Sequence, residues 1–484
     1  MAMTPENNQQ QTDGRTAPEH LSVHDEAATS EGVLERGLGG AAATAIIMGG
    51  MIGSGIFRAP SIVADHAGSP GMSLTVWAVC GLVALCGGLC VAELGAMMPK
   101  TGGLYVYLRE AFRSRFIAFS YGWAAFWLIW PVSMAAVAAV FATYLAVIVE
   151  AATGVTLGVA GQRTAAATCI IGLAVVNCVG VRPSGHLTTI VTTLKVVALL
   201  AIVTLAAVLG ADLPALNTAG EASAAAAYIQ PAAFGAAMIT ALFAFEGWTY
   251  AGYVAGEIRA PQRTLPRSVI AGVLGVTALY LAVNVAYMLV LPFEQFRSSD
   301  RVAADVMNVL AGPAGGLAVS AAVMISTFGA LHVLLLVAPR SAYALAQDKL
   351  FFEPLTRVHA RRRTPMHAIA AQALLACAFV LSGRYDEIIS LAAFPTYLYV
   401  LLTLIAVMVL RRTRPDAPRP YRAFGYPVTP LVCATVVTGY LLTLLMEPTA
   451  LVRTLLGLAI VATGVPFYLL RASVRSGERS IPEP

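Results

Sequence analysis

The sequence predicts an all-α integral membrane protein with twelve transmembrane helices. Hydrophobic residues make up 58% of the chain and charged residues 12%, and the mean hydropathy is +0.74, far from the average of soluble globular proteins. Apolar stretches of about 20 residues, each able to cross a hydrocarbon core of roughly 30 Å, recur along most of the sequence. The lysines and arginines gather in alternate connections, as expected when loops lie on two sides of a membrane.

The expected helices follow one another with short connections. They occupy approximately residues 38–62, 72–98, 116–150, 164–181, 187–210, 232–256, 267–291, 316–346, 366–382, 388–410, 428–446 and 450–470. Residues 1–35 are polar and cannot bury a core, so we expect a disordered cytoplasmic tail before a helical domain at 36–471. A short cytoplasmic tail is expected at 472–484.

Charge sets the expected orientation, because positively charged loops stay cytoplasmic. With the N-terminus inside, the tails and inner loops hold 24 of the 31 lysines and arginines, and the outer loops hold five. The remaining two, Arg58 and Lys195, fall within spans. We therefore expect both termini in the cytoplasm and the chain in a plasma membrane, specifically a bacterial inner membrane.

Enzymatic and nucleic-acid functions have little support. The seven cysteines lie in or near apolar stretches without a CxxC pair or a neighbouring histidine cluster, so we expect neither a metal site nor a cofactor. No basic patch with interleaved aromatic residues argues for nucleic acid. Only seven histidines are present, which makes a histidine proton relay unattractive.

The stretch GGMIGSGIFRAP places Gly49, Gly50, Gly53 and Gly55 inside the first apolar run. Glycines let the backbone leave helical geometry, and such a break is tolerated in a membrane only where it lines a cavity or is packed in protein. The half-helix after a break presents amides that suit a carboxylate, whereas the carbonyls before it suit an ammonium group. Close helix packing by small residues is the alternative.

A second interruption, FAFEGWTYAG, lies at residues 243–252 in the sixth expected helix. Five helices separate the two breaks in register, as expected when a five-helix unit is repeated with inverted topology. The first repeat would span about 38–210 and the second about 232–410, with the two terminal helices at about 428–470. Substrate would then bind at the midplane, between the two broken helices.

The sequence resembles the amino acid/polyamine/organocation (APC) superfamily, and within it the L-amino-acid transporter branch. The resemblance covers roughly residues 38–470. It rests on IGSGIF (52–57), PKTGGLYVYLREAF (99–112), TTLKVVAL (192–199), FAFEGWTYAGYVAGEIRAPQRTLPRSV (243–269) and PRSAYALAQDKLFFEPLTRVHARRRTP (339–365). It implies two inverted five-helix repeats plus two terminal helices, and transport of an amino acid by alternating access.

The resemblance also implies a substrate site at the two breaks. Its residues would be Ile52, Gly53, Ser54, Gly55, Phe243, Ala244, Glu246 and Gly247. The substrate carboxylate would bind the amides of residues 53–55, and the amino group would lie near carbonyls around Ile52 and residues 243–244. Phe243 matches an aromatic residue that closes over substrate, although a packed core aromatic is the alternative. Ser326, Thr327 and Phe328 of the eighth helix could border the pocket, with hydrogen bonds from Ser and Thr to helix carbonyls as the alternative.

Lys195 is expected to act in coupling. An ammonium in the middle of a span is costly and usually faces a partner inside the bundle. In the family, the matching lysine reaches the broken first helix and stands where sodium-coupled relatives hold a cation, which implies sodium independence. Whether it also carries a coupling proton stays open.

Glu246 bears on substrate choice, and three roles stay open. Its carboxylate could pair with a cationic substrate, accept a proton, or bond only to internal Ser, Thr or Tyr groups. Glu257 matches a family motif that suggests an inner gate, with a solvated charge cluster around Arg259, Arg263 and Arg267 as the alternative.

The predicted function is a sodium-independent secondary transporter of neutral or broad-range L-amino acids, working by exchange or proton coupling. A cationic amino acid or polyamine transporter is the alternative, and an amino acid sensor a more remote one. Some members of the branch join a partner subunit through a cysteine in the loop after the third helix. The corresponding loop at 150–163 has no cysteine, so no disulfide-linked partner is expected.

Overall fold

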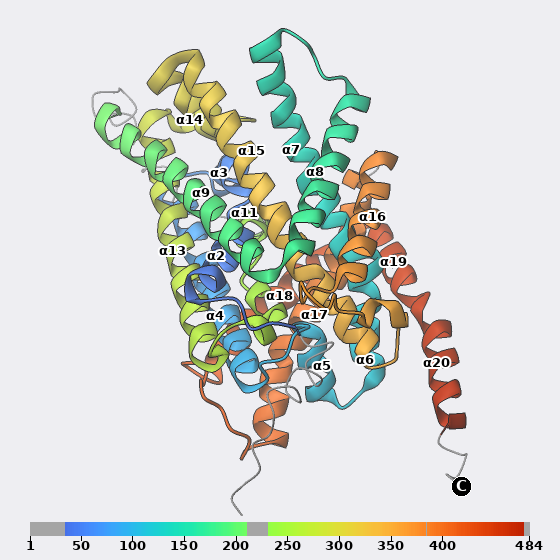
Figure 1. Cartoon of the computed structure of the whole chain (residues 1–484). Coiled ribbons are helices and arrows are strands. Elements are labelled where there is room, and N and C mark those ends of the chain that lie inside the picture. Colours follow the sequence, from blue (N-terminus) through green and yellow to red (C-terminus); the bar gives the residue numbers. More distant parts are fainter. Residues whose placement is uncertain (1–33, 211–230, 384, 479–484) are drawn as a thin grey trace, which may run out of the picture.

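The computed structural model describes residues 34–210, 231–383 and 385–478 (Figure 1). Nearly all of the expected N-terminal tail, the connection at 211–230 and the last six residues lie outside the described residues. The first half of the fold comprises α2 (Gly40–Met51), α3 (Gly55–Ala67), α4 (Pro70–Met97), α5 (Leu104–Phe112), α6 (Arg115–Ala124), the π-helix η1 (Ala125–Ile129), α7 (Trp130–Thr153), α8 (Val159–Val179) and α9 (Val181–Leu209).

The second half of the described chain is also helical. They are α11 (Pro231–Ala244), α12 (Tyr250–Tyr253), the 3₁₀ turn η2 (Ala255–Glu257), α13 (Pro261–Val290), α14 (Phe293–Ser298), α15 (Val302–Gln347), the 3₁₀ turn η3 (Glu353–Thr356), α16 (Met366–Ser382), α17 (Tyr385–Thr413), α18 (Val428–Met446), α19 (Pro448–Ala462) and α20 (Gly464–Glu478). Among the described residues, the isolated β-type pairing is one parallel bridge between Leu38 and Ile258.

The helices agree with an integral membrane fold. Within the described residues, nine are long and apolar enough to cross a membrane, and the bent pair α2 and α3 makes a tenth. The apolar helices at Ala233–Ala244 and Met366–Ser382 are shorter. Every expected apolar stretch is helical, but the layout of twelve spans in two inverted repeats stays a prediction.

Two helices depart from the simple spans expected from hydropathy. The third span contains the π-helical turn η1, and the side-chain amide of Gln372 in α16 donates to the carbonyl of Phe126 within that turn, at 3.3 Å. The long helix α15 begins before the expected span and has a kink at Gly312, where φ is +66° and Pro313 follows. Such irregularities cannot be read from hydropathy, because both turns remain apolar.

The packing places α2 at the centre of the fold. It lies against α9 and α13, while α4 packs along α13 and α7 packs along α15 (Figure 1). By contrast, α18 and α19 expose large apolar side chains such as Leu442, Met446 and Leu455. Exposed apolar surface of this kind suits contact with lipid, as expected for helices at the edge of a membrane bundle.

Ion pairs that involve Arg109 and Arg414 lie at one end of the molecule, called the inner end below. Arg109 of α5 contacts Asp348 at 2.7 Å, and Arg414 contacts Glu110 at 3.2 Å. Deeper in the fold, the buried carboxylate of Glu93 accepts two hydrogen bonds from Arg411, at 2.9 and 2.6 Å. The side of the membrane that this end faces stays a prediction.

Candidate functional site

The predicted break in the first span is present. Helix α2 ends at Met51 and α3 begins at Gly55, with an angle of 46° between them. In the intervening turn the amide of Gly53 donates to the carbonyl of Met51 at 3.0 Å. A Cβ atom at Gly53 would meet no other atom within 4 Å, and residues 53–55 are half-buried. The turn therefore has open space beside it rather than a tightly packed neighbour.

The second predicted break is also present. Helix α11 ends at Ala244, a turn follows, and α12 begins at Tyr250. Gly247 has a φ of +128°, and a Cβ atom there would lie 2.7 Å from the backbone nitrogen of Met51. Only a glycine allows this approach, so the two breaks touch each other through their backbones.

Side chains from two other helices satisfy carbonyls that the first break leaves without helical donors. Lys195 of α9 donates to the carbonyls of Gly49 and Ile52, at 2.8 and 2.7 Å. Ser326 of α15 donates to the carbonyl of Ile52 at 3.0 Å and lies 3.0 Å from that of Gly53. The first break is thus held open by built-in hydrogen-bond donors.

Lys195 is 2% exposed. Its contact with the first break is the one implied by the family resemblance, and it explains how an ammonium persists inside a span. The positive charge replaces its hydration by two carbonyl oxygens at the end of a helix, where the macrodipole is negative. Its role in coupling stays a prediction.

The start of α3 offers the amides expected to bind a carboxylate. Ser54 precedes the helix without a side-chain cap, and its amide has no backbone acceptor among the described residues. The first amides of any helix lack intrahelical acceptors and carry the positive end of its dipole. The arrangement has the chemistry that an anionic group requires, although Gly53 already uses its amide within the turn.

Glu246 lies on the second break and is half-buried. Its charge lies within electrostatic reach of Tyr250, Tyr397 of α17 and Tyr440 of α18. The rings of Tyr397 and Tyr440 are in edge contact, with centroids 4.5 Å apart. Among the described residues the carboxylate accepts no hydrogen bond, so the alternative of purely internal bonding to Ser, Thr or Tyr has no support.

Phe243, the expected outer gate, is 58% exposed. This exposure argues against the alternative in which Phe243 is a packed core aromatic. The side chain projects from the last turn of α11, next to the break. Its gating role stays a prediction.

Glu257 is fully buried at the inner end, which contradicts the alternative of a solvated charge cluster. Its partner is Arg340 of α15, which donates to both carboxylate oxygens at 3.0 and 2.9 Å. The backbone of Glu257 also accepts a hydrogen bond from the amide of Leu38, at 3.0 Å. Glu257 therefore links three segments: its own, which follows α12, α15 through its carboxylate, and the segment before α2 through its backbone carbonyl.

Several residues of the site were not found from the sequence. Tyr280 of α13 places its hydroxyl between the two breaks, and Arg340 is the buried partner of Glu257. A third unexpected buried polar residue, away from the breaks, is His332 of α15, which contacts the Asn177 side chain and the Ser184 carbonyl, at 3.1 and 3.0 Å. A buried polar residue in an apolar run is a sequence signal for all three, but it does not name the partner.

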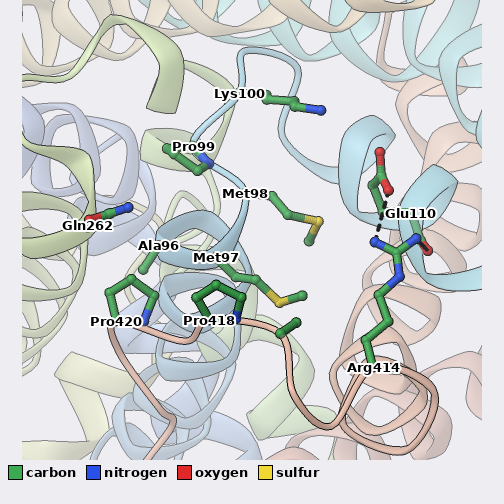
Figure 2. A pocket seen from close by; sticks show the side chains of 11 residues that line it. Ala96, Met97, Met98, Pro99, Lys100, Glu110, Gln262, Arg414, Pro418 and Pro420 are labelled. Atoms are coloured by element: carbon green, nitrogen blue, oxygen red, sulfur yellow. Dashed lines mark hydrogen bonds and ion pairs between the residues drawn. The ribbon is translucent and has the colours of Figure 1, made fainter.

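A cavity of about 290 Å³ opens at the inner end (Figure 2). Lys100, Gln262 and the paired Glu110 and Arg414 contribute its polar side chains, and methionines, prolines and alanines contribute the rest. Partial burial alone would raise the pKa of Glu110, but hydrogen bonds from the two neighbouring arginines outweigh this effect and hold that pKa below its usual value. The cavity contains none of the residues expected to bind substrate.

Comparison with known proteins agrees with this geometry. Residues 38–465 match the family model described as amino acid permease. The chain belongs to this family. It is therefore a member of the APC superfamily, whose proteins are transporters rather than enzymes.

Curated relatives extend over most of the chain. The serine/threonine exchanger SteT of Bacillus subtilis is 30% identical over 407 residues, which cover 84% of this chain and 90% of the relative. The human b(0,+)-type amino acid transporter 1 is 30% identical over 446 residues, covering 92% and 89%. The human large neutral amino acids transporter small subunit 2 is 31% identical over 446 residues, covering 90% and 80%. Amino acid transport is therefore the general role that this permease shares with its relatives.

The buried ion pair at the inner end yields a stability prediction. Glu257→Gln leaves the Arg340 guanidinium buried without a counter-charge, and breaking a buried pair from one side costs about 3–5 kcal/mol. We expect the thermal unfolding midpoint of the purified permease in detergent to fall by several degrees. The matched control is Glu294→Gln, whose pair with Arg297 is exposed and worth at most about 1 kcal/mol. Equal midpoints for the two variants would contradict a stabilising role for the buried pair.

Proposed function

We propose that this permease is a sodium-independent exchanger of neutral L-amino acids that binds their α-amino and α-carboxylate groups at the two breaks. The observation that carries the proposal is the pair of touching backbone breaks, with uncapped amides at the start of α3 and carbonyls at the end of α11. An α-amino acid is a small zwitterion whose two charges match these two kinds of backbone group. The relatives named as exchangers or neutral amino acid transporters support the same substrate class.

Sodium independence is proposed from the position of Lys195. Its ammonium nitrogen lies 2.8 and 2.7 Å from the carbonyl oxygens of Gly49 and Ile52. Carbonyl oxygens of this kind are the ligands that a sodium ion would need, and the side-chain nitrogen of Lys195 already occupies them. A second cation at the same carbonyls would meet strong repulsion.

We propose that the chain forms the twelve transmembrane spans expected from the sequence. The substrate site at the midplane would open alternately to the two sides of the membrane. One relative is named as a small subunit, which indicates that it is part of a larger assembly. We propose that this permease, by contrast, has no disulfide-linked partner. The reason is that the loop expected to carry the linking cysteine has none. The proposed location is a bacterial inner membrane with the inner end in the cytoplasm.

A second candidate is transport of cationic amino acids, favoured by one observation. Glu246 places a half-buried carboxylate without a hydrogen-bond partner, among the described residues, on the second break. A buried carboxylate without a partner is costly, and an ammonium or guanidinium on the substrate side chain would compensate its charge. The b(0,+)-type relative is named only as an amino acid transporter and does not decide between the two.

The proposed function is tested with purified permease in liposomes. Vesicles loaded with unlabelled amino acid should accumulate external labelled amino acid, whereas empty vesicles should not, and replacing sodium by choline should leave the rate unchanged. Uptake into empty vesicles that requires an inward proton gradient would replace exchange by proton coupling. Absence of flux with every amino acid would refute transport and favour the sensor alternative.

The role of Lys195 leads to a second prediction. Lys195→Ala should abolish exchange, because the carbonyls of Gly49 and Ile52 lose their donor and the first break loses its fixed charge. Size-exclusion profile and helical content should remain those of the wild type. The exposed Lys349 offers a matched control, and Lys349→Ala should exchange normally. Normal exchange by Lys195→Ala would show that Lys195 is not required for transport.

Glu246 leads to a third prediction, which separates the two candidate substrates. If cationic amino acids are transported, Glu246→Gln should weaken their apparent affinity by about tenfold or more and leave neutral amino acids nearly unchanged. The physical reason is the loss of one charge-assisted interaction at a partly desolvated site. A uniform change across neutral and cationic substrates would assign Glu246 to a step common to all of them.

A further inference from the structure

Two cavities at the inner end share one charged residue, Lys100. The cavity in Figure 2 has a neighbour of the same volume, about 290 Å³, whose lining includes Leu34, Gly256, Tyr343 and Gln347. Lys100 lines both cavities and is exposed. The neighbour is called the N-terminal cavity below, because Leu34, the first described residue, lies at its edge.

The ammonium group of Lys100 has no hydrogen-bond or ion-pair partner among the described residues. The other charged side chains that line the two cavities are paired, since Arg109 contacts Asp348 at 2.7 Å and Arg414 contacts Glu110 at 3.2 Å. Glu110 lies within electrostatic reach of Lys100, but its two oxygens already accept from the two arginines. Within the described chain, the boundary between the cavities thus keeps one positive charge without a counter-charge.

The walls of the N-terminal cavity come from the two segments that the buried ion pair joins. Gly256 directly precedes Glu257, and Tyr343 lies about one turn after Arg340 on α15. The guanidinium of Arg340 holds the two walls together through its hydrogen bonds to Glu257, at 3.0 and 2.9 Å. A peptide bound in the cavity would contact both walls at once and would oppose their separation.

The N-terminal tail carries the charge that complements Lys100. Residues 1–33 contain six acidic residues and one arginine, although the whole chain has a net charge of +5. Asp25, Glu26 and Glu31 are the three of these six that lie nearest to Leu34 along the chain. They precede Leu34 by nine, eight and three residues. At roughly 3.3–3.6 Å per residue, an extended chain of three to nine residues reaches about 10–30 Å.

The point where the tail joins the fold is fixed beside the cavity. Glu35 forms an ion pair with Arg182 of α9, and the backbone of Leu38 is bonded to residues 257 and 259. These contacts hold Leu34 at the cavity edge. A segment tethered a few residues away has a high effective concentration there, so even weak contacts can bring it into the cavity.

We propose that the N-terminal cavity is the docking site for residues 25–31 of the chain's own tail, whose carboxylates pair with Lys100 and so restrain the opening of the inner end. Charge complementarity and the position of Leu34 support this occupant. The docking involves this chain alone, whereas its effect on the transport rate rests on the proposed exchange. Because the ion pairs are exposed, the docking is weak, reversible and sensitive to salt.

The docking is tested by labelling lysines of the purified full-length permease with an amine-reactive reagent, followed by mass spectrometry. The chain has three lysines, of which Lys195 is buried and Lys349 is exposed but lines neither of the two cavities. Lys349 therefore serves as an internal control for Lys100.

Two triple variants remove the same number of carboxylates from different parts of the tail. D25N/E26Q/E31Q should speed the labelling of Lys100 about threefold, a factor typical of exposed ion pairs, and leave Lys349 unchanged. The matched control, E6Q/D13N/E19Q, changes residues at least 15 positions from Leu34 and should label as the wild type does. At about 1 M salt, where the Debye length is about 3 Å, the difference should disappear.

Exchange in liposomes tests the restraint. D25N/E26Q/E31Q and Lys100→Gln should each raise the exchange rate about two- to threefold, whereas E6Q/D13N/E19Q should match the wild type. The combination of D25N/E26Q/E31Q with Lys100→Gln should be no faster than either alone, because both remove the same contact.

Three results would overturn the inference. Equal labelling of Lys100 in the two triple variants would refute the docking, and faster labelling with an unchanged exchange rate would refute the restraint. Additive gains in the combined variant would show that the tail and Lys100 act separately. Failure of the proposed function is distinguishable, since the wild type would then exchange no amino acid while the labelling result still stood.

Discussion

The fold depends on how the carbonyls at the first break find donors away from water. A helix interrupted inside a membrane leaves carbonyls unpaired, and each unpaired group costs several kcal/mol in hydrocarbon. Here Lys195, Ser326 and Tyr280 reach this turn from three different helices and donate to its oxygens. The same hydrogen bonds that make the break tolerable also fix the positions of α9, α13 and α15 around it.

The second break is shaped by the first. Gly247 approaches the backbone between Gly50 and Met51 so closely that a Cβ atom would have no space, and Gly50 in turn lies against the ring of Tyr250. Two interruptions from distant parts of the sequence thus meet without a side chain between them. Backbone groups, rather than side chains, form the surface that the substrate is proposed to meet, which suits recognition of the atoms that all α-amino acids share.

The sequence predicted the breaks and the helices well, because glycine clusters and apolar run lengths are local signals. A lysine deep in an apolar run needs a partner inside the fold, and the contact of Lys195 with the first break is the one that the resemblance implied, whereas its coupling role stays a prediction. The sequence did not identify Tyr280, His332 or the pairing of Glu257 with Arg340. These contacts join helices far apart in the sequence, and periodicity alone cannot say which buried polar groups face each other. The carbonyl of Ile52, one of those expected near the substrate amino group, accepts hydrogen bonds from residues more than 140 positions away, and its role in substrate binding stays a prediction.

The bridge between Leu38 and Ile258 has a mechanical consequence. The amide of Leu38 donates to Glu257, and the carbonyl of Leu38 accepts from Arg259, at 3.0 and 2.9 Å. These two hydrogen bonds join the extended segment before α2 to the segment after α12. Helices α2 and α12 are therefore linked at this end, as well as at the contact between Gly247 and Met51. A displacement of these joined segments relative to α15 would separate Glu257 from Arg340 and expose the two buried charges to water.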